Sequence, residues 1–498
     1  MEPIMRMAGF DAGFLYMETP SVHMHTLKIA VLEPSEDNTF DNLIEKLTER
    51  LRLLPPMRRR IVTIPLSLYH PLLISQPQIE PDRHFFRHDI GGDGTMRDLE
   101  EVIGSICSVP LDRGAPMWEL HLCEGLADGK VAVVGKIHHA VADGLAANAM
   151  IANIMDVSST DVRPAVHAES DEGAEAPGSG LLLRHAVRDA VRHILGIPQL
   201  FLTTMRRLGA VFRYRRDQGA RVPMLIKDAP RVSFNAPLTA RRTFASVSIP
   251  LDDLKAARAA HSDIPNLTLN DVVLAVVSGA LRRWLKMHGE VPRSTLLAGV
   301  PVGLSADDPE PRMMGNSVTN LCTTLATDEE DPDRRLRAIS TTTRHAKAIS
   351  QLLGPTLMQW SQFAPPAPFA MAVRAYSKMR AARFFPPPFN VIVSNVPGPK
   401  EPVKVGGAQL ADILSVGPLT EGIGLNVTAW SYQDHMNFSL LACPDLLPDV
   451  EKLVAFFPAA LAELRGTPEP GAAAAPISKD QVKQDRPDAH EHIKKETA

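Results

Sequence analysis

The sequence predicts an α/β protein, because short apolar runs of strand length alternate with longer stretches of helical periodicity. The runs that we interpret as strands are 131–137, 244–249, 296–302, 390–396 and 438–442. We interpret 145–157, which follows the first of these strands, and 268–288 as helices. With 498 residues, 45 % of them hydrophobic, the chain has enough apolar material for a large core and for two or three domains.

Charge and cysteine content exclude several classes of function. The formal net charge is -4, so the chain has no global basic excess of the kind that binds nucleic acid. The four cysteines are far apart and form no CxxC pair, which indicates reduced thiols in a cytoplasmic protein. No apolar stretch is long enough to span a bilayer, and the first residues do not resemble a signal peptide. We therefore expect any membrane contact to come from one side.

Two polar segments divide the chain. The stretch 157–180 is rich in Pro, Gly, Ser and acidic residues, and the end of the chain beyond Gly466 has a similar character. Neither segment can bury enough apolar surface to fold by itself. The predicted organisation is an N-terminal domain over 1–157, a linker and crossover over 158–231, a C-terminal domain over 232–465 and a disordered tail over 466–498.

The region 181–221 concentrates positive charge, with nine arginines against two aspartates. Its helical periodicity on both sides of Pro198 predicts two amphipathic helices. Arg184, Arg188 and Arg192 share one face of the first helix. The predicted apolar stripes consist of Leu183, Val187, Ala190 and Ile194, and of Phe201, Met205, Leu208 and Phe212. We expect these helices to pack on the domains as a crossover, with a second role at an anionic lipid surface as the alternative.

A pair of histidines follows the predicted strand 131–137. Adjacent strand residues point to opposite faces, so only one of His138 and His139 can face a given pocket, and the pair lacks the i, i+4 spacing of metal ligands on a helix. A neutral histidine can take a proton from an alcohol. Asp143 is close enough to contact His139 across a turn, and Gly144 leaves room for a substrate. These residues alone fit a catalytic histidine and a buried structural one equally well.

The segment 138–144 matches the HHxxxDG motif of the CoA-dependent acyltransferase superfamily, which includes peptide-synthetase condensation domains. Further segments resemble the bacterial wax ester synthase/diacylglycerol acyltransferase family. They are PLDRGAPMWE at 110–119, NDVVLA at 270–275, SNVPGP at 394–399, and PV at 301–302 followed by Gly315-Asn316. Because they occur in the order of that family along most of the chain, the protein is identified as a member of it.

This resemblance implies a two-domain chloramphenicol acetyltransferase-like fold, with mixed sheets flanked by helices and an active-site tunnel between the domains. It implies an O-acyltransferase that moves a long-chain acyl group from acyl-CoA to diacylglycerol or to a long-chain alcohol. His139 would be the general base beside His138, with Asp143 holding the loop and Gly144 next to it. The reaction needs acyl-CoA as a co-substrate but no cofactor or metal. Because the products are insoluble, we also expect contact with the inner face of a membrane or with a lipid droplet.

Other residues of the family segments have less specific roles. Asn270 and Asp271 are weaker candidates for substrate binding, and Asn270 could instead be the N-cap of the helix 268–288. In the block 110–119 we expect an ion pair between Asp112 and Arg113, and Trp118 in the core. The prolines and glycine of 394–399 are expected to fix a turn.

Two departures from the family pattern keep alternatives open. Ala115 replaces an arginine of the 110–119 block, and Ser305 stands where members often carry arginine, although Arg312 could supply that charge. The alternatives are a condensation-type acyltransferase, which uses a carrier-protein donor or a specialised-metabolite acceptor, and a lipid-binding paralogue without catalysis. His23 and His25 share a face of a predicted strand, but no partner motif makes them metal ligands.

Overall fold

The structure is a computed structural model. It describes residues 4–35, 39–52, 54–76, 78–142, 146, 150, 155–156, 177–220, 222–223, 228–290, 293–303 and 314–466. Asp143, Gly144, Ser305 and Arg312 therefore lie outside the described residues, as do residues 157–176 and the tail after Gly466.

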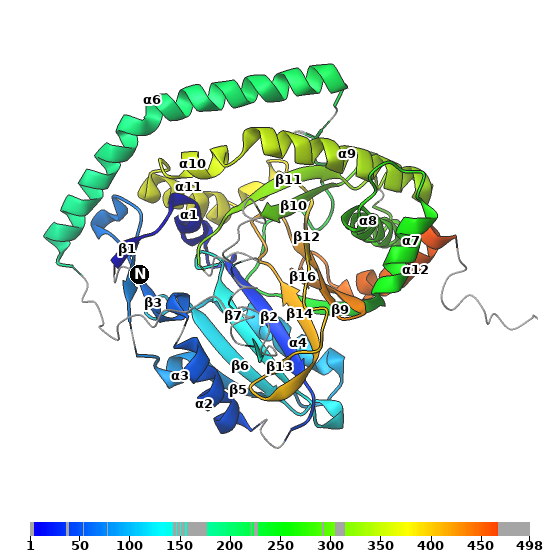
Figure 1. Cartoon of the computed structure of the whole chain (residues 1–498), viewed down its shortest axis with the longest axis horizontal. Coiled ribbons are helices and arrows are strands. Elements are labelled where there is room, and N and C mark those ends of the chain that lie inside the picture. The colour runs from blue at the N-terminus through cyan, green and yellow to red at the C-terminus, as the bar shows by residue number, and fades with distance from the viewer. Residues whose placement is uncertain are drawn as a thin grey trace, which may run out of the picture.

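Two mixed sheets form the centre of the molecule (Figure 1). In sheet order, the seven-stranded sheet contains β5 (Phe85–Asp89), β6 (Trp118–Glu124), β7 (Val131–His138), β2 (His25–Leu32), β14 (Ala408–Val416), β13 (Lys404–Val405) and β8 (Met155–Asp156). The six-stranded sheet contains β11 (Val318–Thr324), β10 (Leu297–Gly303), β12 (Val391–Val396), β15 (Leu425–Tyr432), β16 (His435–Ala442) and β9 (Thr243–Pro250). A third, small sheet joins β1 (Ile4–Arg6), β4 (Leu72–Ser75) and β3 (Arg59–Val62). The predicted α/β class is confirmed, and all five predicted strands are present.

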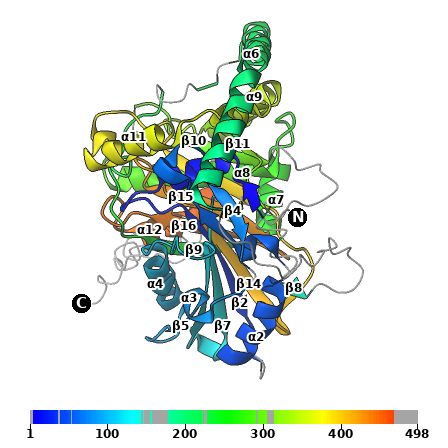
Figure 2. The ribbon, with the colours of Figure 1, turned by 90° about the vertical axis from the view of Figure 1, so that its left-hand side faces the viewer.

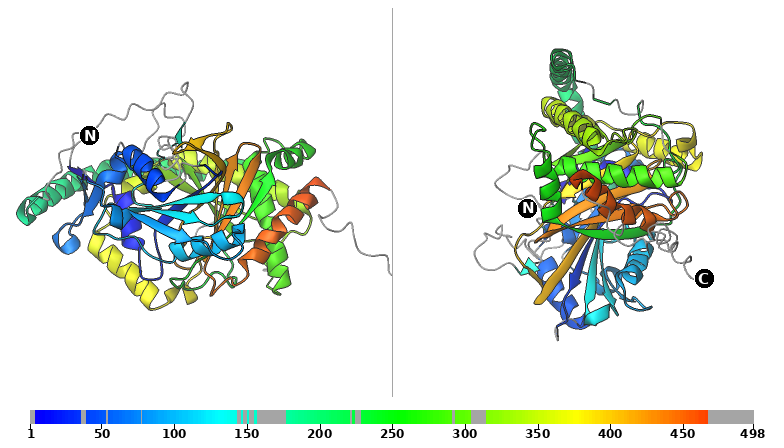
Figure 3. Two further views of the ribbon diagram at one scale, coloured as in Figure 1. Left: turned by 90° about the horizontal axis from the view of Figure 1, so that it is seen from below. Right: turned by 90° about the vertical axis from the view of Figure 1, so that its right-hand side faces the viewer.

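The two large sheets meet along β14. By sequence β13 and β14 belong to the predicted C-terminal domain 232–465, yet they complete the sheet of the N-terminal half, where β14 pairs antiparallel with β2. On its other side β14 contacts β15 and β16, and Asn437 Nδ2 donates a hydrogen bond to the Ile413 carbonyl at 2.9 Å. Figure 3 shows this long orange strand among the blue and cyan strands of the N-terminal half. The halves are therefore interlocked through a shared sheet.

Helices cover both large sheets (Figure 2). The α-helices are α1 (Gly9–Met17), α2 (Phe40–Leu51), α3 (Pro81–His84), α4 (Met96–Cys107), α6 (Ser179–Gln218), α7 (Leu251–Ala260), α8 (Leu269–Met287), α9 (Pro332–Leu353), α10 (Thr356–Ser361), α11 (Pro366–Lys378) and α12 (Val450–Arg465). The short 3-10 helices are η1 (Pro55–Arg58), η2 (Pro65–Ser67), η3 (Ala127–Gly129) and η4 (Ala381–Arg383). Helices α2 and α4 pack on opposite faces of the seven-stranded sheet, because Val133 contacts the α2 cluster and Val134 the α4 cluster.

The predicted helix 268–288 is confirmed as α8, the most buried helix of the fold. Val272 to Ala280 are buried because the helix packs against the six-stranded sheet, α9 and α12. Its first turn is closed by a capping box: the Thr268 hydroxyl accepts from the Asp271 N–H at 3.2 Å, and the Asp271 carboxylate accepts from the Thr268 N–H at 2.9 Å. The N-cap is therefore Thr268, and the interpretation of Asn270 as the cap is wrong.

The segment around Pro198 forms one long helix, α6, where we predicted two. Figure 1 shows α6 as a green arch that bends partway along the outside of the molecule. A proline inside a helix removes one backbone hydrogen bond and bends the axis, but it does not have to end the helix when both flanks favour helix. The predicted helix 145–157 is wrong at its end, because Met155 and Asp156 form β8 and pair with β13.

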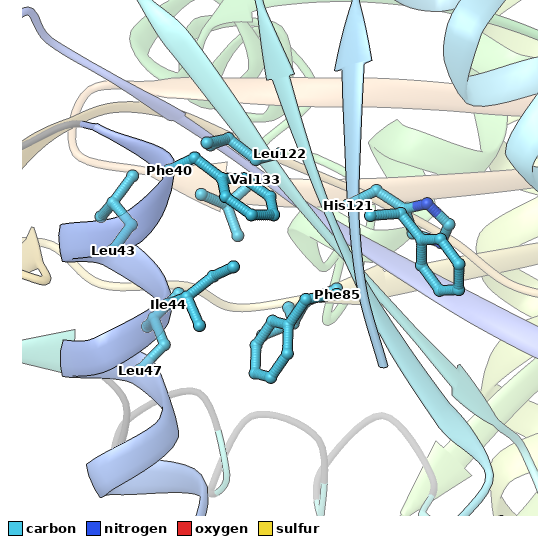
Figure 4. A pocket seen from close by; sticks show the side chains of 10 residues that line it. Phe40, Leu43, Ile44, Leu47, Phe85, His121, Leu122 and Val133 are labelled. Atoms are coloured by element: carbon cyan, nitrogen blue, oxygen red, sulfur yellow. The ribbon is translucent and has the colours of Figure 1, made fainter. Parts of the chain in front are cut away.

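A small cavity separates α2 from the seven-stranded sheet (Figure 4). The lining side chains of α2 face those of β5, β6 and β7; the residues labelled in the figure are Phe40, Leu43, Ile44, Leu47, Phe85, His121, Leu122 and Val133. Because the lining is apolar apart from His121 and does not include the 138–139 pair, we assign this space to the core rather than to reaction chemistry.

The SNVPGP turn can be tested through Gly398, which follows β12. A Cβ at this position would meet the Ser431 carbonyl oxygen and the Trp430 indole, neither of which can move without shifting β15. Gly398→Ala should therefore lower the free energy of unfolding by about 1–3 kcal/mol in urea titrations. Gly209→Ala in α6, where a Cβ meets nothing within 4 Å, is the matched control and should leave stability unchanged or raised. Equal stability of both variants would show that the turn tolerates a side chain.

Candidate active site

The two adjacent histidines have different surroundings. His138 ends β7 and is completely buried. The Ala140 N–H donates to His138 Nδ1 at 3.0 Å, so the proton of the neutral ring is on Nε2, which lies 3.6 Å from a carboxylate oxygen of Glu18. Burial lowers the pKa of His138 even though Glu18 opposes this effect. His138 is thus a neutral ring next to His139.

Glu18 places a negative charge next to His138. Its side chain is 8 % exposed and accepts hydrogen bonds from Arg113, whose Nε lies 2.9 Å from Oε2. Burial favours the neutral acid, but contact with His138 and Arg113 outweighs burial and lowers the Glu18 pKa to about 2. Arg113 also donates to the Leu15 carbonyl at 3.0 Å, so it ties the 110–119 block to α1.

The 110–119 block is therefore architectural, but not through the predicted pair. Arg113 pairs with Glu18 and Asp112 pairs with Arg83, since each side chain finds an opposite charge on a neighbouring segment. Trp118 lies in the core as expected, and its indole N–H donates to the Met57 carbonyl at 2.8 Å. Ala115 is buried as well.

His139 lies half-buried at the start of the loop after β7, between an aromatic ring and an amide. Phe14 of α1 stacks on the imidazole, with the ring centroids 4.4 Å apart and the planes at 17°. His139 Nδ1 lies 3.1 Å from the side-chain oxygen of Asn316. The backbone N–H of His139 donates to the Met24 carbonyl at 2.7 Å, which fixes the loop to the chain just before β2.

The contacts of Asn316 determine which ring nitrogen of His139 carries the proton. Asn316 Nδ2 donates to Asp11 Oδ1 and to the His139 carbonyl, each at 2.8 Å. Both are acceptors, so the amide cannot be turned round without placing its oxygen against two other oxygens. The amide oxygen must then face the ring, where it can only accept. In the neutral imidazole, Nδ1 therefore bears the hydrogen and Nε2 bears the lone pair that a general base needs.

Asn316 reaches the motif because two loops pair with each other. The Gly315 N–H donates to the Val141 carbonyl at 2.7 Å, and Ala142 and Gly315 form a parallel bridge. The resemblance pointed to Gly315-Asn316 as a family segment but gave it no role. Sequence reasoning missed Asp11, Phe14 and Glu18 of the α1 region altogether. The available signal was a pair of acidic residues within and just after an apolar nine-residue helix, where charge is unusual.

The remaining site candidates are placed as follows. Asn270 on α8 accepts a hydrogen bond of 3.4 Å from Asn395 Nδ2 on β12, so the ND and SNVPGP segments lie together. The Asp271 carboxylate serves the capping box of α8. Substrate binding by these two residues stays a prediction. His23 and His25 both contact the Cys107 carbonyl, at 3.3 and 3.1 Å, and within the described residues no group of three or more His, Cys, Asp or Glu could hold a metal ion.

Glu18 gives the site a testable pH dependence. Its pKa of about 2 lies below the ordinary value of 4.5, so its stabilising effect is complete above about pH 5 and is lost as the pH falls toward 2. Glu18→Gln should lower the free energy of unfolding at pH 7 by roughly 2–3 kcal/mol, and this difference from the wild type should shrink by about half near pH 3. Denaturant titrations at both pH values measure it. Glu80→Gln, which breaks a half-exposed pair with Arg83, is the control and should change little at either pH.

Comparison with known proteins matches both halves of this chain to one family. Residues 7–273 match the wax ester synthase/diacylglycerol acyltransferase catalytic domain, and residues 314–465 match the C-terminal domain of the same family. A protein of Mycobacterium tuberculosis H37Rv, named provisionally as a diacylglycerol O-acyltransferase, is 37 % identical over 464 residues, which are 92 % of this chain and 96 % of the relative. A second protein of that organism with the same provisional name is 32 % identical over 92 % of this chain and 90 % of its own length.

Solved structures agree on the fold. The wax ester synthase/diacylglycerol acyltransferase from Marinobacter aquaeolei VT8 superposes with a TM-score of 0.63 at 25 % identity, covering 92 % of this chain and 98 % of that one. The first condensation domain of the CDA synthetase gives a TM-score of 0.54 at 14 % identity, over 93 % and 98 % of the two chains, and supports the fold alone. The chain belongs to the wax ester synthase/diacylglycerol acyltransferase family.

Proposed function

We propose that this protein is an O-acyltransferase that transfers a long-chain acyl group from acyl-CoA to a lipid alcohol, either diacylglycerol or a long-chain alcohol. The observation that carries the proposal is the state of His139, whose hydrogen-bonded Nδ1 leaves the lone pair on Nε2. Family membership supplies the reaction class, since the related proteins are named for the same acyl transfer.

In the proposed reaction the hydroxyl oxygen of the acceptor attacks the thioester carbonyl carbon of acyl-CoA while His139 Nε2 takes the hydroxyl proton. The tetrahedral intermediate then loses the thiolate of CoA as the carbon–sulfur bond breaks. His139 returns its proton to that thiolate, so the products are an ester and free CoA. Direct transfer in a complex with both substrates needs no acyl-enzyme, and Asp143 and Gly144 of the motif are proposed to shape the loop that carries the base.

We further propose that α6 places the enzyme on an anionic lipid surface at the cytoplasmic side of a membrane or on a lipid droplet. Most residues of both predicted apolar stripes of α6 face solvent: Val187 is 56 % exposed, Ile194 59 %, Phe201 51 % and Phe212 69 %. Ala190 is the exception, because it packs against the core cluster that contains Leu182 and Ala186. Surface arginines accompany the exposed residues on the same helix. Exposed apolar rows beside basic residues are the composition of helices that lie in the interface of anionic membranes.

The crossover function of α6 uses other residues, so the apolar rows are not needed for it. Leu182 and Ala186 are buried against β4. Farther along, the Trp360 indole N–H donates to Thr204 at 2.9 Å, and Tyr214 hydrogen-bonds His345 at 3.0 Å. These contacts join α6 to both halves of the chain, which supports its proposed role as a crossover. Within the described residues, no helix is long and apolar enough to cross a membrane.

His139→Ala should reduce acceptor-dependent release of free CoA from palmitoyl-CoA by at least about 10³-fold, because the general base is lost. Purified protein is assayed with diacylglycerol, with hexadecanol and without acceptor. His88→Gln is the matched control: His88 is half-buried on β5, hydrogen-bonds His121 and should leave the rate unchanged. A fully active His139→Ala variant contradicts the assignment. Wild-type release from an acyl carrier protein but not from acyl-CoA favours the condensation-type alternative.

Substituting Arg184, Arg188 and Arg192 by glutamine should weaken binding to vesicles that contain phosphatidylglycerol by roughly 100-fold, since each arginine near an anionic surface contributes about 1 kcal/mol. Vesicle flotation measures the bound fraction, and vesicles of phosphatidylcholine alone measure the part that is independent of charge.

The control for this experiment removes equal charge elsewhere, by substituting the exposed arginines Arg258, Arg334 and Arg344 with glutamine. Binding that survives the first set of substitutions, or that falls equally with both sets, would leave α6 with its crossover function alone.

A further inference from the structure

We infer that Asn316 and Asp11 are positioning residues that keep the proton of His139 on Nδ1, so that the base is competent only when α1, the loop after β7 and the loop before β11 are assembled. The inference rests on the proposed function, in which Nε2 of His139 accepts the hydroxyl proton. Neither residue is assigned contact with substrate.

The first argument is the number of bonds that hold Asn316. Its backbone N–H and its Nδ2 both donate to the same oxygen of Asp11 at 2.8 Å, and Nδ2 also donates to the His139 carbonyl at 2.8 Å. Asn316 is 4 % exposed and Asp11 8 %. Reversing the amide would bury its oxygen against two acceptors and leave its N–H group facing the ring. A buried polar group without its partner costs about 1–3 kcal/mol, which is enough to keep one orientation.

The second argument is the position of Asp11 on α1. Asp11 lies in the first turn of this helix, where the unpaired backbone N–H groups favour a negative charge. A carboxylate can only accept hydrogen bonds, so it holds the Asn316 N–H groups and cannot compete as a donor. Phe14, three residues later and therefore on the same side of the helix, stacks on the His139 ring. One short helix thus fixes both the plane of the imidazole and its proton.

The third argument is chemical. With the proton on Nε2 the base would have no lone pair toward the hydroxyl, and catalysis would first have to move that proton. When Nε2 takes the substrate proton, the ring becomes an imidazolium whose Nδ1–H points at the Asn316 oxygen. Asp11 lies behind the same amide and polarises it toward that charge. The arrangement performs the orienting function of a carboxylate in a catalytic triad, with an amide between the carboxylate and the ring.

The experiment compares kcat, KM for palmitoyl-CoA and the pH–rate profile in three variants of the full chain. Asn316→Leu removes the acceptor and should lower kcat by about 10²- to 10³-fold with KM changed less than about threefold. Asn316→Asp places two carboxylates together and should be similarly impaired. The double variant Asp11→Asn with Asn316→Asp restores a donor–acceptor pair with the same net charge. It should regain at least about tenfold over Asn316→Asp and move the acidic limb of the profile to higher pH, because a carboxylate now contacts Nδ1 directly.

Asn235→Leu is the matched control. Asn235 is also 4 % exposed, and its Nδ2 donates to two carbonyls, those of Asn390 at 3.0 Å and Gly422 at 3.1 Å. It should lose stability comparably without a change in the pH–rate profile. The inference is overturned if Asn316→Leu retains a kcat within about twofold of the wild type, or if the double variant is no better than Asn316→Asp.

A second readout separates this inference from the proposed function. In protein labelled with ¹⁵N-histidine, the His139 signals are identified by their loss in His139→Ala. They should show a protonated Nδ1 and an unprotonated Nε2 near neutral pH. Asn316→Leu should abolish that preference. The opposite tautomer in an active wild-type enzyme overturns the inference alone. The expected tautomer in a protein that releases no CoA with any donor overturns the proposed function alone.

Discussion

The pairing of two loops, one from each half of the chain, is the constraint on which the site depends. The hydrogen bond from Gly315 to Val141 holds the segment before β11 against the end of β7, next to which Asn316 contacts His139. The two sheets could not support it if they moved independently. Strand β14 links the two sheets, because it belongs to the seven-stranded sheet and contacts β15 and β16 of the six-stranded one. The surroundings of His139 are therefore set by the assembled fold more than by its own strand.

Burial explains why two adjacent histidines have opposite characters. The side chain of His138 points into the protein, where its neutral form is favoured and Glu18 and Arg113 supply a compensated pair of charges nearby. The next residue, His139, has passed the end of the strand and is only half-buried. One position at the end of β7 thus separates the fully buried His138 from the half-buried His139. Because His138 is neutral and Arg113 pairs with the ionised Glu18, the buried charges next to His138 are balanced.

The sequence predicted what depends on local pattern. The α/β class, five strands and helix α8 follow from apolar periodicity, and the histidine motif stands out because of its residue types. What sequence could not predict depends on long-range pairing. Nothing local says that β14 completes the sheet of the other half, or that Asp11 lies beside Asn316, 305 residues away. Arg113 shows the same limit, since an adjacent aspartate looked like its partner but a buried Glu18 was available after folding. The sequence analysis overestimated the power of Pro198 to end a helix, because the cost of one lost hydrogen bond is small in a forty-residue helix.

The helix that carries Asp11 and Phe14 also contacts an element that holds α6. The Gly9 N–H of α1 donates to Gln362 at 3.0 Å, and a Cβ on Gly9 would collide with the Ser361 backbone, so α1 lies directly on the end of α10. On α10, Trp360 donates to Thr204 of α6. The segment of α10 and Gln362 therefore contacts both α6 and α1, the helix that carries Asp11 and Phe14. The contacts that hold α6 and those that hold α1 beside His139 thus belong to one packed unit. Buried and hydrogen-bonded residues accordingly attach both ends of α6 to the rest of the protein, although most of this long helix is exposed.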